Sequence, residues 1–128
     1  MEWRAILAVG AGAALGGIAR LLITQLVIAR AIGSAFYATL FINVTGSFLI
    51  GLVISIAATR PGFSPLLRLF LATGILGGYT TFSTFSLEAT SLWNAGSTLT
   101  AAGYVLGSVA LGILAAIGGL AAGRALAP

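Results

Sequence analysis

The sequence predicts an all-α integral membrane protein in which four transmembrane helices form a single domain over residues 1–128. Hydrophobic residues make up 59% of the chain and charged residues only 6%, whereas soluble domains carry about 25% charged residues. A spanning helix needs about 20 mostly apolar residues, so four such segments with short connectors use the whole chain. We therefore expect a multi-pass protein embedded in a lipid bilayer.

The first expected span covers residues 5–29 and carries Arg20 in its second half. This apolar run is longer than the hydrophobic region of a signal peptide, and the chain stays apolar after it, so a cleaved leader is disfavoured. A turn at Gly33-Ser34 separates the first span from the second, which is expected over residues 36–58.

Proline and glycine in Arg60-Pro61-Gly62 end the second span, because both residues interrupt regular elements. The third span is expected over residues 66–92 and is broken near its centre, in the vicinity of Gly77-Gly78. A loop signal at residues 94–97 precedes the fourth span, which is expected over residues 99–126.

The stretch GGYTTFSTF at residues 77–85 is polar and glycine-led within an apolar segment. Backbone in hydrocarbon must satisfy its own hydrogen bonds, so a helix is interrupted there only beside protein or a polar cavity. Freed carbonyls can hold a cation, and freed amides favour anions. We therefore expect the functional site at this interruption, where Phe82 and Phe85 lie among hydroxyl side chains.

The composition argues against an enzyme and against nucleic-acid binding. Cysteine, histidine and aspartate are absent, which removes thiol chemistry, histidine proton transfer and the usual zinc ligands. The carboxylates are Glu2 and Glu88. The net charge of +4 reflects six scattered arginines, which are typical of interfacial anchors and not of a nucleic-acid patch. Their bias toward the side of both termini favours cytoplasmic termini.

Two expected spans carry polar stripes at four-residue spacing. Thr39, Asn43 and Ser47 share one face of the second span, and Tyr104 and Ser108 share one face of the fourth. Such residues either form interhelical hydrogen bonds or line a path, and on the residues alone both interpretations stay open.

Two ionisable residues and several glycine pairs also need an interpretation. Glu88 is a functional candidate inside the third span, although interfacial exposure is equally compatible with its position. Arg20 is either a vestibule charge or a residue that snorkels to the interface. Small residues that allow close helix packing recur at four-residue spacing: Gly12 with Gly16, Gly103 with Gly107, and Gly119 with Gly123.

The stretch at residues 77–86 closely resembles the third-helix signature of the Fluc/CrcB fluoride channels. Residues 16–20 and 39–48 are similar to the first- and second-helix motifs of that family. The resemblance implies an antiparallel, dual-topology homodimer with two pores that exports fluoride passively from the cytoplasm. It also implies the inner membrane of a bacterial or archaeal cell.

The resemblance further implies roles for individual residues. A structural sodium ion would be held at the dimer interface by the backbone carbonyls of Gly77 and Thr80. The fourth-helix polar strip departs from the family at Gly112, where a hydroxyl is common. The expected fluoride pore residues are Thr39, Asn43, Phe82, Phe85, Tyr104 and Ser108.

Two other classes compete with this interpretation. A dual-topology exporter of cationic drugs needs a carboxylate deep in its first helix, but the central charge of residues 5–29 is Arg20. A structural subunit without a path would explain the glycine pairs, but not a hydroxyl-rich interruption beside Phe82 and Phe85.

Overall fold

The computed structural model describes residues 2–30 and 34–126, and within these residues the chain is helical with no strand. Three helices are long and apolar enough to cross a membrane: α1 (Glu2–Ala29), α2 (Ala35–Thr59) and α6 (Thr98–Ala125). Their bounds confirm three of the expected spans to within three residues. Of the expected turn at Gly33-Ser34, Gly33 lies outside the described residues, and Ser34 is the N-cap of α2.

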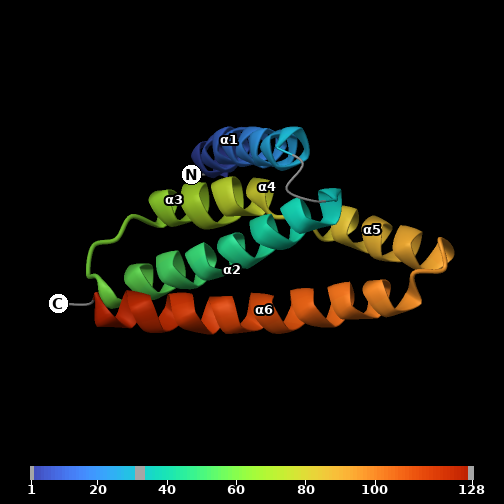
Figure 1. Ribbon diagram of the computed structural model, residues 1–128. Coiled ribbons are helices and arrows are strands. Elements are labelled where there is room, and N and C mark those ends of the chain that lie inside the picture. The colour runs from blue at the N-terminus through green and yellow to red at the C-terminus, as the bar shows by residue number, and fades with distance from the viewer. Residues whose placement is uncertain (1, 31–33, 127–128) are drawn as a thin grey trace.

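The chain between α2 and α6 is divided into several helical pieces. They are α3 (Pro65–Arg68), a π-helix η1 (Leu69–Leu76), α4 (Gly77–Tyr79) and α5 (Phe82–Asn94). In Figure 1, α3 and α4 lie between α1 and α2, and α5 runs from the end of α4 toward the start of α6. The sequence signals did not predict the π-helix, a form that is frequent at functional sites.

The interruption lies at Thr80 and Thr81, which have extended backbone (φ −79°, ψ 158° and φ −149°, ψ 117°) between α4 and α5. The interruption thus lies near Gly77 and Gly78, as expected, although both glycines are themselves helical. Only a short stretch of chain separates the glycines from the interruption, but the glycines do not cause it.

Gly78 serves close packing against α1 and does not break the helix. A Cβ atom at Gly78 would lie 2.8 Å from the Cα of Ala13, and one at Gly16 would lie 2.7 Å from the Tyr79 nitrogen. Real Cβ atoms do not approach backbone this closely, so glycine is required where the two backbones meet. The expected packing role of the Gly12–Gly16 pair is thereby confirmed.

Helices α2 and α6 lie side by side along much of their length (Figure 1). A Cβ at Gly119 would collide with the Phe48 carbonyl, and one at Gly123 would lie 2.5 Å from the Ser55 Cβ. The Ser55 hydroxyl also donates a hydrogen bond to the carbonyl of Leu120, at 3.0 Å. The Gly119–Gly123 pair therefore packs as expected.

The Gly103–Gly107 pair behaves differently. A Cβ at either residue would meet nothing within 4 Å among the residues that the structure describes. The expectation that this pair packs against another helix is therefore not met within a single chain. Glycines at four-residue spacing are thus in close contact with α2 near the C-terminal end of α6, but have no such contact near its N-terminal end.

Candidate functional site

The side chain of Asn43 on α2 forms two hydrogen bonds with the backbone at the interruption. Its Nδ2 donates to the carbonyl of Thr81 at 3.0 Å, and its Oδ1 accepts from the Thr81 N–H at 2.8 Å. A carboxamide has both a donor and an acceptor, so one asparagine can satisfy both polar groups of this peptide position. Asn43 therefore replaces the helical partners that the extended backbone of Thr81 gives up.

The interruption frees several backbone carbonyls, among them those of Gly77 and Thr80. In a continuous helix the Gly77 carbonyl would accept from the N–H of Thr81, and the Thr80 carbonyl from that of Thr84. The Thr81 N–H instead donates to Asn43, and the Thr84 N–H donates to the Thr81 hydroxyl at 3.2 Å, an N-cap of α5. Both carbonyls therefore lose the donor that a helix would supply.

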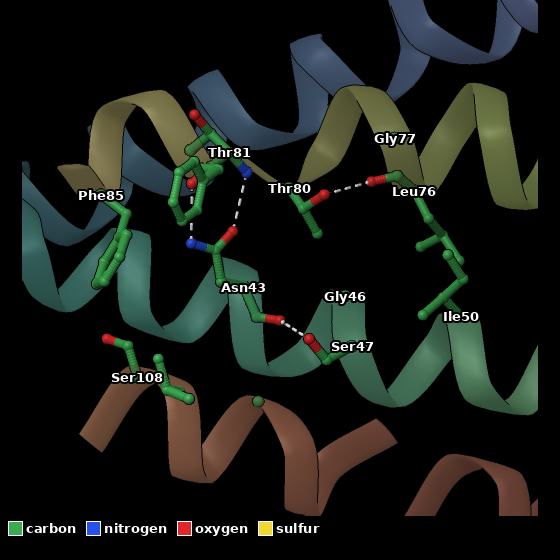
Figure 2. Close-up of a pocket in the computed structure, with 13 residues that line it drawn as sticks. Asn43, Gly46, Ser47, Ile50, Leu76, Gly77, Thr80, Thr81, Phe85 and Ser108 are labelled. Carbon is green, nitrogen blue, oxygen red and sulfur yellow. Dashed lines mark hydrogen bonds between the residues drawn. The ribbon is translucent and has the colours of Figure 1, made fainter. Parts of the chain in front are cut away.

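A groove with a volume of about 320 Å³ lies beside the interruption, bounded by α2, by the chain from the end of η1 to the start of α5, and by α6. Figure 2 shows Asn43 between Thr81 above it and Ser47 below it, with Ser108 facing them from α6. Of the six expected pore residues, the groove contains four: Asn43, Phe82, Phe85 and Ser108.

The hydroxyl of Ser108 is the next feature of the groove. Its Oγ is buried and has no hydrogen-bond partner among the described residues. A buried hydroxyl without a partner is unfavourable by about 1–3 kcal/mol, so natural structures rarely contain one without a reason. The Ser108 hydroxyl is thus a free donor and acceptor in the wall of the groove.

The two phenylalanines border the groove from the start of α5. Their ring centroids lie 5.7 Å apart with an interplanar angle of 43°. Phe82 is 79% exposed, whereas Phe85 is partly buried and packs on the ring of Tyr104 at 5.2 Å. The exposed ring of Phe82 has no cover from its own chain, and the ring of Phe85 links the groove to the next cluster.

The other two expected pore residues, Thr39 and Tyr104, do not line the groove. The Thr39 hydroxyl donates to Oε1 of Glu88 at 3.0 Å, and the Tyr104 hydroxyl donates to Oε2 at 2.7 Å. Thr39 and Tyr104 are 5% and 6% exposed, while Glu88 is partly buried, and the cluster joins α2, α5 and α6. Glu88 also lines a second hollow of about 360 Å³ near the start of α2.

Arg20 is partly buried on α1 and, within the described part of the chain, lies apart from the residues of the groove. Among the described residues, its side chain makes no hydrogen bond with the other expected site residues. Helix α1 contacts mainly η1 and α4.

Two contacts near the site had no sequence signal that identified them. The hydroxyls of Tyr79 and Thr45 lie 3.0 Å apart and join α4 to α2. Gly46, one residue later, contacts the methyl group of Thr80, because a Cβ there would overlap it. Both contacts are tertiary, since their partners are more than 30 residues apart in the chain.

Comparison with known proteins gives a consistent result. The family described as CrcB-like protein, Camphor Resistance (CrcB), matches residues 7–120. A protein of Rhizobium meliloti named fluoride-specific ion channel FluC is 51% identical over 122 residues, which cover 94% of this chain and 97% of the relative.

Two further relatives carry the same name. The protein from Nitrobacter winogradskyi is 48% identical over 121 residues, which cover 94% of this chain and 95% of the relative. The protein from Rhodopseudomonas palustris is 52% identical over 116 residues, which cover 90% of this chain and 93% of the relative.

Proposed function

The chain belongs to the CrcB-like protein family, and from this premise we propose that it is a fluoride-selective ion channel that exports fluoride passively from the cytoplasm. The names of its relatives support an ion channel and not an enzyme. Their fluoride specificity is the reason to ask how the groove could accept this ion.

The observation that carries the proposal is the unpartnered hydroxyl of Ser108 in a groove that Phe82 and Phe85 border. Fluoride is small and strongly hydrated, so a pore must replace its water by close hydrogen-bond donors. Ser108 supplies such a donor, and Asn43 has a second N–H besides the one that it donates to Thr81. Phenylalanine rings have electropositive edges, which Phe82 and Phe85 can turn toward an anion.

Thr39 and Tyr104 act differently in this proposal. Their hydroxyls donate to Glu88, so they can meet an ion only by exchanging the carboxylate for it. We assign these three residues to the end of the path, next to the hollow that Glu88 lines. Arg20 would act as a vestibule charge away from the narrow part of the path.

The working unit in this proposal is an antiparallel, dual-topology homodimer with two pores. The 79% exposure of Phe82 supports a second copy, because a ring that lines a pore needs a facing wall. Residues 65–94 would together form the third membrane span of each copy, interrupted at Thr80 and Thr81. Such a dimer would reside in the inner membrane of a bacterial or archaeal cell.

A structural sodium ion at the dimer interface is part of the same proposal. The carbonyls of Gly77 and Thr80 fit a hard cation, because both lose their helical donors at the interruption. Among the described residues no cluster of acidic, cysteine or histidine side chains offers an alternative metal site. A bound cation would make the local potential more favourable to anions.

Purified protein in liposomes loaded with potassium fluoride tests the proposal. We expect rapid fluoride release, measured with a fluoride electrode, and no comparable release of chloride from matched liposomes. Absence of fluoride release, or equal release of chloride, would contradict it. The competing drug exporter is separated by growth of sensitive host cells, which the chain should protect against fluoride and not against cationic drugs.

A further inference from the structure

The polar face of α6 stops inside the groove. Tyr104 and Ser108 present hydroxyls at four-residue spacing, but the next position on this face is Gly112, which also lines the groove. Glycine has no side chain that could bind an ion. A path that follows α6 alone would therefore lose its donors at this level.

Ser47 lies directly across the groove from this gap. A Cβ atom built at Gly112 would be 3.6 Å from the Ser47 Oγ, and within 4 Å it would meet no other atom of the described residues. The Ser47 hydroxyl is therefore the polar group that faces the space left by the missing side chain. Both residues belong to the lining of the groove, and Ser47 is labelled in Figure 2.

The Ser47 hydroxyl can turn toward an ion without leaving a backbone group unpaired. It donates to the carbonyl of Asn43 at 2.7 Å. Within α2 the same carbonyl also accepts the N–H of Ser47, four residues later, so it keeps a partner when the hydroxyl rotates. Only rotation about the Cβ–Oγ bond is needed, and this is a fast motion.

We propose that Ser47 is an ion-contacting residue, and that the line of donors crosses from Ser108 on α6 to Ser47 on α2 at the level of Gly112. This inference rests on the proposed fluoride channel and adds to it a residue and a direction. The other role for Ser47 is purely structural, as a hydroxyl that is bonded to its own helix.

The test moves the hydroxyl from one wall of the groove to the other. Ser47→Ala removes it and should lower fluoride release from liposomes about tenfold, as expected for one lost hydrogen bond to a charged group. Adding Gly112→Ser to Ser47→Ala places a hydroxyl in the same space and should restore release to within about threefold of the unmodified protein. The matched control, Ser47→Ala with Gly112→Ala, adds the same carbon without the oxygen and should stay low.

Two results would overturn the inference. One is a Ser47→Ala variant that releases fluoride at the unmodified rate. The other is equal recovery in the alanine and serine double variants, since this would assign the effect to volume. Failure of the unmodified protein to release any fluoride would instead contradict the proposed function itself, so the two failures are distinguishable.

Discussion

The two ends of α6 carry similar small residues but have different surroundings. In the C-terminal half, Gly119 and Gly123 bring the backbone of α2 into direct contact. In the N-terminal half, Ser108 and Gly112 face a groove, and a Cβ at Gly103 would meet nothing within 4 Å among the described residues. Small residues therefore close one half of the helix pair and leave the other half open.

The difference follows from what faces each half. Within the described part of the chain, the C-terminal half of α6 packs against α2, and its glycines allow the two helices to touch. Opposite the N-terminal half, Asn43 holds the extended backbone of Thr81 beside the groove (Figure 2). The groove thus lies next to a stretch where the two helices are in direct contact. Variants in the two halves should accordingly affect different measurements.

The largest expected effect is on ion flow from a change in the open half. Phe82→Ile removes a ring edge that can face the anion, and we expect fluoride release to fall at least about hundredfold, equivalent to about 2.7 kcal/mol. Because Phe82 is 79% exposed in the chain, folding should be retained, and size-exclusion chromatography checks this together with the dimer. The matched control is Phe41→Ile, the same change at a residue that is 53% exposed on α2. Unchanged release from Phe82→Ile liposomes would refute the assignment of this ring.

The next effect is on stability in the closed half. Gly119→Ala forces a Cβ against the carbonyl of Phe48 and should lower the free energy of unfolding by about 2 kcal/mol. Thermal unfolding in detergent measures this as a lower Tm. Gly103→Ala is the matched control and should keep the Tm or raise it slightly, because alanine favours helix over glycine. An equal loss at both positions would remove the proposed contrast between the halves.

Asn43→Leu should slow fluoride release about tenfold, because it removes a donor from the groove and both hydrogen bonds to Thr81. Its control in the closed half is Ser55→Ala, which loses one hydrogen bond to the Leu120 carbonyl and should leave release unchanged. If Asn43→Leu liposomes release fluoride at the unmodified rate, Asn43 is only an interhelical contact.

Tyr79→Phe is expected to have the smallest effect. It removes the hydroxyl that bonds to Thr45 while keeping the buried ring, so the free energy of unfolding should fall by about 1 kcal/mol. A Thr45→Val variant should lose a similar amount, and the double variant should lose no more than either alone. Additive losses in this double-mutant cycle would show that the two hydroxyls do not act as a pair.

The helices that the sequence predicted well are those with a local signal. The limits of α1, α2 and α6 follow from apolar length and from turn residues. A glycine with positive φ occurs in the two later expected loops, at Gly62 (φ 84°) and Gly96 (φ 79°). Four of the six expected pore residues share one groove because they lie in the polar stretch or on stripes with helical spacing.

The errors concern contacts between distant segments. Glycine was interpreted as a helix breaker at Gly78, but the residue is helical and packs on Ala13 of α1. The actual interruption at Thr81 depends on Asn43, 38 residues earlier in the chain. Likewise, no local pattern indicated that Thr39 and Tyr104 would both donate to Glu88, since these three residues come from three helices.

The dependence of Thr81 on a side chain from α2 has a consequence for biosynthesis. Before α2 packs against the chain from α3 to α5, no carboxamide can accept a hydrogen bond from the Thr81 N–H. The hydrocarbon of the bilayer contains no water that could replace it. We expect the newly inserted segment to be a continuous helix at this stage, with Thr81 paired to Gly77. The proposed ion path would then form only when the inserted helices associate. Before that, the isolated segment would contain no interruption and would conduct no ions.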